Sequence, residues 1–114
     1  MSAASNELLQ VLRSAREYLA RPANDFFWSG WQDADAAIRE IDGMIGIVET
    51  GKLPRREDVS ILFLPTGPIQ EVSISSGWGD EFLSLAEQAD DVLERAYAQR
   101  WIRWLKRLFG IERD

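Results

Sequence analysis

Apolar residues recur every three or four positions in three long stretches of the chain, which is the spacing of one face of an α-helix. These stripes comprise Leu8, Leu12, Ala15 and Leu19; Ala34, Ile38, Ile41, Ile45 and Val48; and Phe82, Leu85, Ala86, Ala89, Leu93 and Ala96. Ser5 or Asn6 can cap the first helix, and Pro22 ends it. Asp80 is a suitable N-cap for the third helix. The pattern therefore predicts three main helices.

The third stripe runs into a basic, tryptophan-rich segment near the C-terminus. Its apolar members are Trp101, Trp104, Leu105 and Leu108, and its basic members are Arg100, Arg103, Lys106 and Arg107. We expect an extended C-terminal helix in which the apolar side chains pack against the domain and the basic side chains reach water. A basic amphipathic helix of this kind could instead contact a membrane surface or lie in a partner's groove.

Two shorter segments have the features of β-strands. Val59 to Leu64 is almost wholly apolar, as expected of a strand that is covered on both faces. In Ile69 to Ser75, Val72 and Ile74 alternate with polar residues, which is typical of a strand with one wet face. The run Pro65-Thr66-Gly67-Pro68 between them supplies a turn. We therefore predict an α+β fold in which the three main helices pack around a short antiparallel β-hairpin.

The composition is that of an ordinary folded domain. The 114 residues are 46% apolar and 28% charged, which fits a single globular domain over residues 1–114. The start of the chain lacks a secretory signal pattern, and no apolar run approaches the roughly 20 residues of a membrane span. The absence of cysteine fits a reducing compartment. We expect a cytoplasmic protein with no membrane span.

The net charge of −6 indicates which partners are favoured. Proteins that bind nucleic acids usually carry a basic surface that neutralises phosphates, so nucleic-acid binding is disfavoured. An acidic surface attracts basic molecules and speeds their association. A basic protein partner is therefore the class that the charge favours.

Histidine and cysteine are both absent, which removes much catalytic and metal chemistry. Without them the chain has no Ser-His or Cys-His nucleophile pair and no ligand set for structural zinc. The carboxylates Glu71, Asp80 and Glu81 could form an acid–base pair or a magnesium site, but no recognised catalytic motif surrounds them. We therefore favour a surface and helix-cap role for them, and we predict no catalytic residue, no metal and no cofactor.

Tryptophan is unusually frequent, with five residues in the chain. Trp28, Trp31 and Trp78 lie beside the predicted elements, where half-buried indole rings often anchor interfaces or line pockets. Polar residues of the predicted hairpin and of the start of the third helix are close to them in the sequence. The candidate binding residues are therefore Trp28, Trp31, Thr66, Gln70, Glu71, Ser73, Trp78, Asp80 and Glu81.

About half of the chain, from Asp25 to Phe82, carries a distinctive set of short motifs. They are Phe27-Trp28-Ser29-Gly30-Trp31, Leu62-Phe63-Leu64-Pro65-Thr66-Gly67-Pro68-Ile69-Gln70-Glu71-Val72-Ser73, Ser76-Gly77-Trp78 and Glu81-Phe82. With these motifs the chain resembles an uncharacterised family of small bacterial proteins. The resemblance implies no particular activity. Small acidic bacterial domains are often immunity proteins, which bind and block a toxin, and this analogy rests on size and charge.

We expect a non-catalytic protein-binding domain, most concretely an immunity-type inhibitor of a basic bacterial toxin or nuclease. The carboxylates would steer association, and Trp78 and Trp28 would anchor the contact. A homodimer through the Val59 to Leu64 strand or the C-terminal helix is a further hypothesis. The main alternative is a small-molecule-binding protein or carboxylate-based enzyme whose pocket lies between the second helix and the hairpin, lined by Trp31, Thr66, Gln70, Glu71 and Trp78.

Overall fold

The computed structural model describes residues 2–108 and 110, and it describes the side chains of all of these except residues 99–106. In this part of the chain the helices are α1 (Ala3–Leu19), α2 (Ala34–Glu49), α3 (Arg56–Phe63), α4 (Pro68–Ser76) and α5 (Gly79–Leu108). No β-strand occurs among the described residues. The predicted α+β fold is therefore wrong, because the described chain is all-helical.

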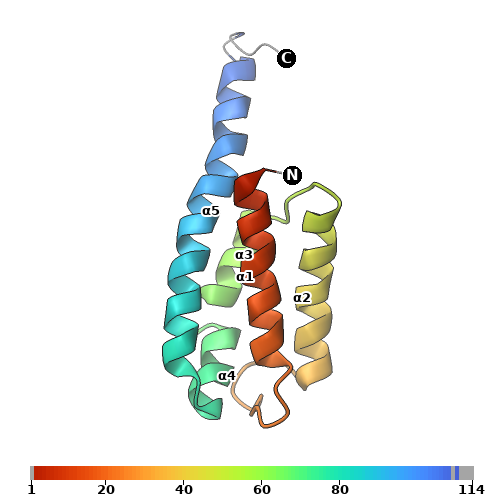
Figure 1. Cartoon of the computed structure of the whole chain (residues 1–114), viewed down its shortest axis with the longest axis vertical. Coiled ribbons are helices and arrows are strands. Elements are labelled where there is room, and N and C mark those ends of the chain that lie inside the picture. Colours follow the sequence, from red (N-terminus) through yellow and green to blue (C-terminus); the bar gives the residue numbers. More distant parts are fainter. Residues whose placement is uncertain (1, 109, 111–114) are drawn as a thin grey trace.

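The helices form an antiparallel bundle in which one leg is broken (Figure 1). α1 and α2 run in opposite directions, α3 and α4 follow one another along the third leg, and α5 returns along the fourth. α1 is central, because it packs against α2, α4 and α5. α5 also packs against both halves of the broken leg. The result is an elongated molecule of 53 × 23 × 21 Å.

The three predicted apolar stripes supply the core, which confirms the three main helices. Buried members include Leu8, Leu12, Ala15 and Leu19 of α1, Ile41, Ile45 and Val48 of α2, and Phe82, Leu85, Ala89 and Leu93 of α5. Burying each large aliphatic side chain stabilises the fold by roughly 1.5 to 3 kcal/mol. α1 begins earlier than predicted, because the hydroxyl of Ser2 accepts a hydrogen bond from the N–H of Ser5 at 3.1 Å and caps the helix. Asp80 lies in the first turn of α5.

The segment predicted as the first strand is α3. Val59, Leu62 and Phe63 are buried at the spacing of a helical face. Ile61 and Leu64, between and beyond them, are exposed. A short apolar run cannot be assigned to a strand or to a helix by its pattern alone, and here the packing of one face against α5 decides. Residues 59–64 therefore offer no strand edge through which two copies of the chain could pair, as the homodimer hypothesis required.

The segment predicted as the second strand is α4. Ile69, Val72 and Ser73 are buried together on one helical face. Ile74, expected on the buried face of a strand, is 63% exposed. Pro68 fits this helix because it occupies the first turn, where its missing N–H leaves no hydrogen bond unmade. The preference of branched side chains for strands depends on context, and the bundle provides a helical context.

A tight junction at residues 64–67 joins α3 to α4, where a hairpin turn was predicted. Leu64 is extended, as expected before a proline. Thr66 has a left-handed φ of 63°, and its N–H donates a hydrogen bond to the side chain of Gln70. The N–H of Gly67 donates to the carbonyl of Leu64 at 2.9 Å. Gln70 therefore closes this junction.

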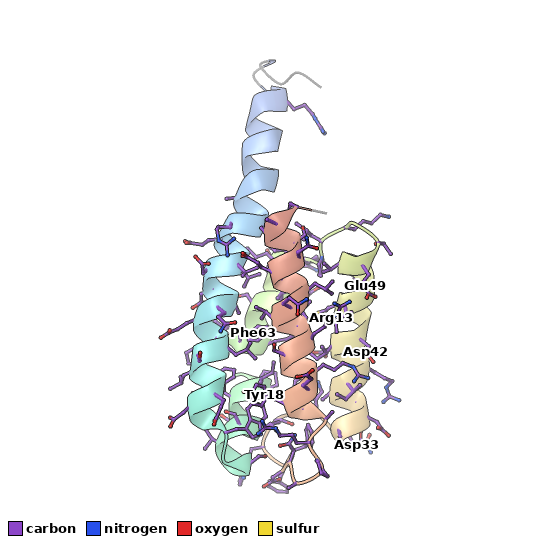
Figure 2. The ribbon with its side chains drawn as sticks, in the orientation of Figure 1. Arg13, Tyr18, Asp33, Asp42, Glu49 and Phe63 are labelled. Carbon is purple, nitrogen blue, oxygen red and sulfur yellow. The ribbon has the colours of Figure 1, made fainter. Side chains whose placement is uncertain are left out.

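Two ion pairs connect α1 with α2 (Figure 2). Arg13 Nη2 lies 2.9 Å from Glu49 Oε2. Arg16 Nε donates to Asp42 Oδ1 at 2.6 Å, and this hydrogen bond lowers the pKa of Asp42 below its ordinary value of 3.8. Both pairs are about half exposed, so solvent and salt screen them and their contribution to stability is small.

The substitution Asp42→Asn is expected to make the free energy of unfolding less sensitive to low pH. The pKa of Asp42 is lower in the folded chain than in the unfolded chain, so its pair with Arg16 stabilises the fold above about pH 4 and this contribution is lost as the pH falls through the folded pKa. Urea denaturation at a series of pH values measures the effect. The wild type should lose more free energy of unfolding below about pH 4 than Asp42→Asn does. Glu40→Gln, another exposed carboxylate of α2, is the control, and an unchanged acid response in Asp42→Asn would contradict the prediction.

The last part of α5 continues beyond the N-terminal end of α1, where no other described helix accompanies it (Figure 1). The predicted packing of Trp101, Trp104 and Leu105 against the domain lies outside the described side chains. Leu108 is described and is exposed. None of the described helices combines the length and the apolar character that crossing a bilayer requires.

Candidate functional site

The loop between α1 and α2, residues 20–33, presents two aromatic side chains to solvent. It lies at the end of the bundle where α4 ends and α5 begins (Figure 1). Phe27 is 77% exposed and Trp28 is 67% exposed. Their rings meet edge to face, with centroids 4.7 Å apart, and we call them the aromatic pair. Aromatic side chains gain much free energy on burial, so two adjacent exposed rings indicate an interaction surface.

Hydrogen bonds to the bundle hold this loop in place. The side chain of Asn24 donates to the carbonyl of Tyr18, near the end of α1, at 2.7 Å. The N–H of Asp25 donates to Ser76 Oγ, at the end of α4, at 2.9 Å. The loop is therefore attached to two different helices just before the aromatic pair.

Further hydrogen bonds order the loop internally. Asp25 Oδ1 accepts from the N–H of Phe27 at 2.9 Å. Ser29 Oγ donates to the carbonyl of Phe26 at 2.8 Å and accepts from the N–H of Trp31 at 3.1 Å. Such side-chain bonds to the nearby backbone are how short polar residues shape turns. Because the backbone on both sides of the aromatic pair is bonded, the loop backbone loses little conformational entropy on binding.

Trp78 lies in the core on the bundle side of the loop, so the prediction that it is an exposed anchor is wrong. Its side chain is 2% exposed. The indole Nε1 donates to Asn24 Oδ1 at 2.9 Å, and the ring stacks on Tyr18 with centroids 4.9 Å apart. The guanidinium of Arg21 lies 4.4 Å from the centroid of the Tyr18 ring, which is labelled in Figure 2. Trp78 therefore supports the loop from within.

A hollow of about 610 Å³ lies beside the aromatic pair, between the loop and the start of α2. Its lining includes Arg21, Asn24, Phe26, Phe27, Trp31 and Asp33. Trp31, one of the predicted binding residues, is half-buried in this wall. The hollow gives space next to Phe27 for a side chain of a partner or for a small molecule.

Exposed carboxylates lie at this end of the bundle. Asp25 belongs to the loop and Asp33 caps α2. Asp80 and Glu81 lie in the first turn of α5, and all four of these residues are exposed. Arg21 is the basic residue of the loop. The end therefore carries exposed carboxylates as well as the aromatic pair, a combination that suits a basic surface with an apolar recess.

The other predicted binding residues lie at the junction between α3 and α4, midway along the bundle (Figure 1). Thr66 and Gln70 are bonded to each other there. Ser73 is buried, and its hydroxyl donates to the carbonyl of Gln70 at 2.8 Å. Glu71 is in the first turn of α4, at the opposite end of that helix from the start of α5. These residues shape the fold and do not join the loop.

The pocket predicted between the second helix and the hairpin lacks one of its walls, because residues 59–75 form no hairpin in the described chain. α2 packs against α1, and the hollow beside Trp31 includes none of the other predicted pocket residues, which are Thr66, Gln70, Glu71 and Trp78. Among the described side chains, no group of three or more acidic residues is arranged to hold a metal ion. The structure thus brings Trp28, Trp31, Asp80 and Glu81 to one end and separates them from the rest.

Sequence reasoning did not single out Phe27 or Asn24. The run Phe26-Phe27-Trp28 was the available signal for Phe27, because three consecutive aromatic residues outside a helical stripe cannot all reach one core. No local signal marks Asn24, whose partner Trp78 lies 54 residues away in the chain. Its role follows from the tertiary fold.

Comparison of the chain with models of protein families, with curated proteins and with solved structures finds no significant match. The geometry of the α1–α2 loop is therefore the main support for a function. The resemblance to a family of small bacterial proteins stays a prediction.

Proposed function

We propose that this protein is a non-catalytic protein-binding domain and that the loop of residues 20–33 is its binding site. The observation that carries the proposal is the exposed aromatic pair on a loop that is hydrogen-bonded to α1 and α4. Tryptophan is enriched among the few residues that supply most of the binding energy at interfaces. A preset loop adds affinity, because less freedom is lost when the partner binds.

The proposed partner is a basic protein. Asp25 and Asp33 belong to the loop of the aromatic pair, Asp80 and Glu81 lie at the same end of the bundle, and the whole chain carries a net charge of −6. Such carboxylates accelerate association with a basic surface and select against acidic ones. A bacterial toxin or nuclease that the protein inhibits in the cytoplasm is the concrete form of this proposal, and it draws on size, charge and the resemblance to small bacterial proteins.

Trp28→Ala is expected to weaken partner binding by about 2 kcal/mol or more, roughly 30-fold in Kd, because the indole would fill a recess of the partner. The immobilised wild-type protein would capture candidates from a lysate of the source organism, and calorimetry would measure the affinity of the captured protein for each variant. If the partner is a toxin, coexpression of the wild type should restore growth and coexpression of Trp28→Ala should not.

The matched control for this experiment is Ile61→Ala, which removes an exposed apolar side chain from α3, away from the loop. Ile61→Ala should bind like the wild type. Thermal unfolding should be nearly unchanged in both variants, because both side chains are exposed. A captured protein that binds Trp28→Ala and the wild type equally would overturn the assignment of the loop as the site.

The hollow beside the loop favours a second candidate, which is a small-molecule-binding protein. Its volume of about 610 Å³ falls within the range of ligand sites, and Trp31 and Arg21 offer an aromatic wall and a cation. A ligand that binds there should raise the melting temperature by mass action, and the rise should shrink in Trp31→Ala. The carboxylate-enzyme form of this alternative is weaker, because α4 separates Glu71 from Asp80 and Glu81.

A further inference from the structure

The face of α5 that packs in the bundle does not continue into its C-terminal part. Leu93 and Ala96 are the last members of the buried stripe, with Tyr97 beside them. At the same helical spacing the next positions on this face are Arg100, Arg103 and Arg107, with Trp104 at its edge. Three arginines cannot extend an apolar core, which explains why the bundle ends near Tyr97 while the α5 backbone continues (Figure 1).

The C-terminal part of α5 has an apolar face of its own. Trp101, Trp104, Leu105 and Leu108 share one face by register, rotated by roughly a third of a turn from the bundle-packing face. The basic residues of this stretch lie on the remaining surface, together with Ile102. Residues 99–108 contain four basic residues and no acidic one. This is the pattern of a helix that lies at a boundary between an apolar and a negatively charged phase.

We propose that residues 99–108, which we call the α5 extension, bind the surface of a membrane that contains anionic lipids. Tryptophan and leucine on one face would enter the boundary between headgroups and acyl chains. Arginine and lysine on the other would stay among the phosphates, each contributing through its attraction to the negative surface. The proposal uses the opposite end of the molecule from the aromatic pair, so it goes beyond the proposed protein-binding function (Figure 1).

The charge of the preceding part of α5 limits this contact to the extension. Glu87, Asp90 and Glu94 are exposed and lie, by register, on the same side of α5 as Trp101 and Leu105. A negative surface repels these carboxylates within a Debye length, about 8 Å at physiological salt. The bundle is therefore held away from the membrane, with the loop of residues 20–33 directed toward the solution.

Sedimentation of the full chain with lipid vesicles tests the proposal. The protein should bind vesicles of phosphatidylcholine mixed with phosphatidylserine and should bind phosphatidylcholine vesicles far more weakly. Arg103→Gln combined with Lys106→Gln should lower the affinity roughly 30-fold, because two charges near the surface are lost. Trp101→Ser combined with Leu105→Ser should lower it on the order of tenfold or more by removing apolar contact.

The matched control is Arg13→Gln combined with Arg39→Gln, which removes the same charge from exposed positions on α1 and α2. This variant should bind the mixed vesicles nearly as well as the wild type, and circular dichroism should show that all variants are folded. The proposal is overturned if the wild type does not bind mixed vesicles, if it binds both vesicle types equally, or if the control loses as much affinity as the extension variants. Since the extension variants keep Trp28, their partner binding should be intact, which separates this test from that of the loop.

Discussion

Trp78→Ala is expected to lower the free energy of unfolding by about 3 to 5 kcal/mol, the range for removing a buried aromatic side chain. The indole is 2% exposed and stacks on Tyr18, so its removal leaves a cavity between α1, α4 and α5. The side chain of Asn24 also loses the indole N–H that now donates to it at 2.9 Å. Urea denaturation followed by circular dichroism measures the change.

Trp28→Ala is the matched control for this prediction, because it makes the same exchange at an exposed tryptophan. Its free energy of unfolding should stay within about 0.5 kcal/mol of the wild type. The free energy of unfolding of Trp78→Phe should lie between those of Trp28→Ala and Trp78→Ala. Phenylalanine keeps most of the apolar contact but loses the hydrogen bond to Asn24. Equal losses in Trp28→Ala and Trp78→Ala would show that the burial of Trp78 has been misassigned.

Gly67→Ala is expected to lower the free energy of unfolding by about 2 to 3 kcal/mol, because the junction between α3 and α4 has no room for a side chain. A Cβ at residue 67 would lie 2.7 Å from the carbonyl oxygen of Ile61 and 2.9 Å from that of Leu64. Both atoms belong to the backbone, so the contact can be relieved only by moving α3 relative to α4. Such a movement would disturb the apolar faces that these helices bury against α5.

Gly43→Ala and Gly46→Ala in α2 are the controls for Gly67→Ala. A Cβ at either position meets nothing within 4 Å, and both residues lie inside a helix. Alanine favours a helix over glycine by up to about 1 kcal/mol, so these variants should be slightly more stable than the wild type. A destabilisation by Gly67→Ala no larger than the shift of the α2 variants would contradict the close approach at the junction.

These variants separate the fold from the proposed function. Substitution of Trp28 should weaken partner binding and hardly change the free energy of unfolding, whereas substitution of Trp78 should mainly lower the free energy of unfolding. Trp78 still affects the site indirectly, because Asn24 connects it to the loop that carries the aromatic pair. A partly destabilised Trp78→Phe protein should therefore bind its partner less tightly without losing any direct contact.

Long-range periodicity made α1, α2 and most of α5 predictable from the sequence. Each has enough turns for the spacing of its apolar residues to exclude a strand, and the residues of these stripes, such as Leu12, Ile41 and Leu93, are indeed buried. The net charge and the absence of histidine and cysteine also limit the chemistry that the chain can carry. For the candidate site, the sequence pointed to Trp28 and Trp31, because indole rings beside helices often anchor interfaces or line pockets.

The sequence by itself determined the three long helices, the acidic surface and the basic, tryptophan-rich end. The helices follow from an apolar spacing that many residues repeat, and the other two features follow from the residue types alone. Only the tertiary structure decided the state of residues 59–64 and 69–75, which are too short for their pattern to distinguish a helix from a strand until α5 covers one face of each. The tertiary structure also decided which tryptophan is exposed to solvent and which is buried. Trp28 and Trp78 are the same residue type, and their different exposure comes from Tyr18 and Asn24, neighbours that only the folded chain brings together.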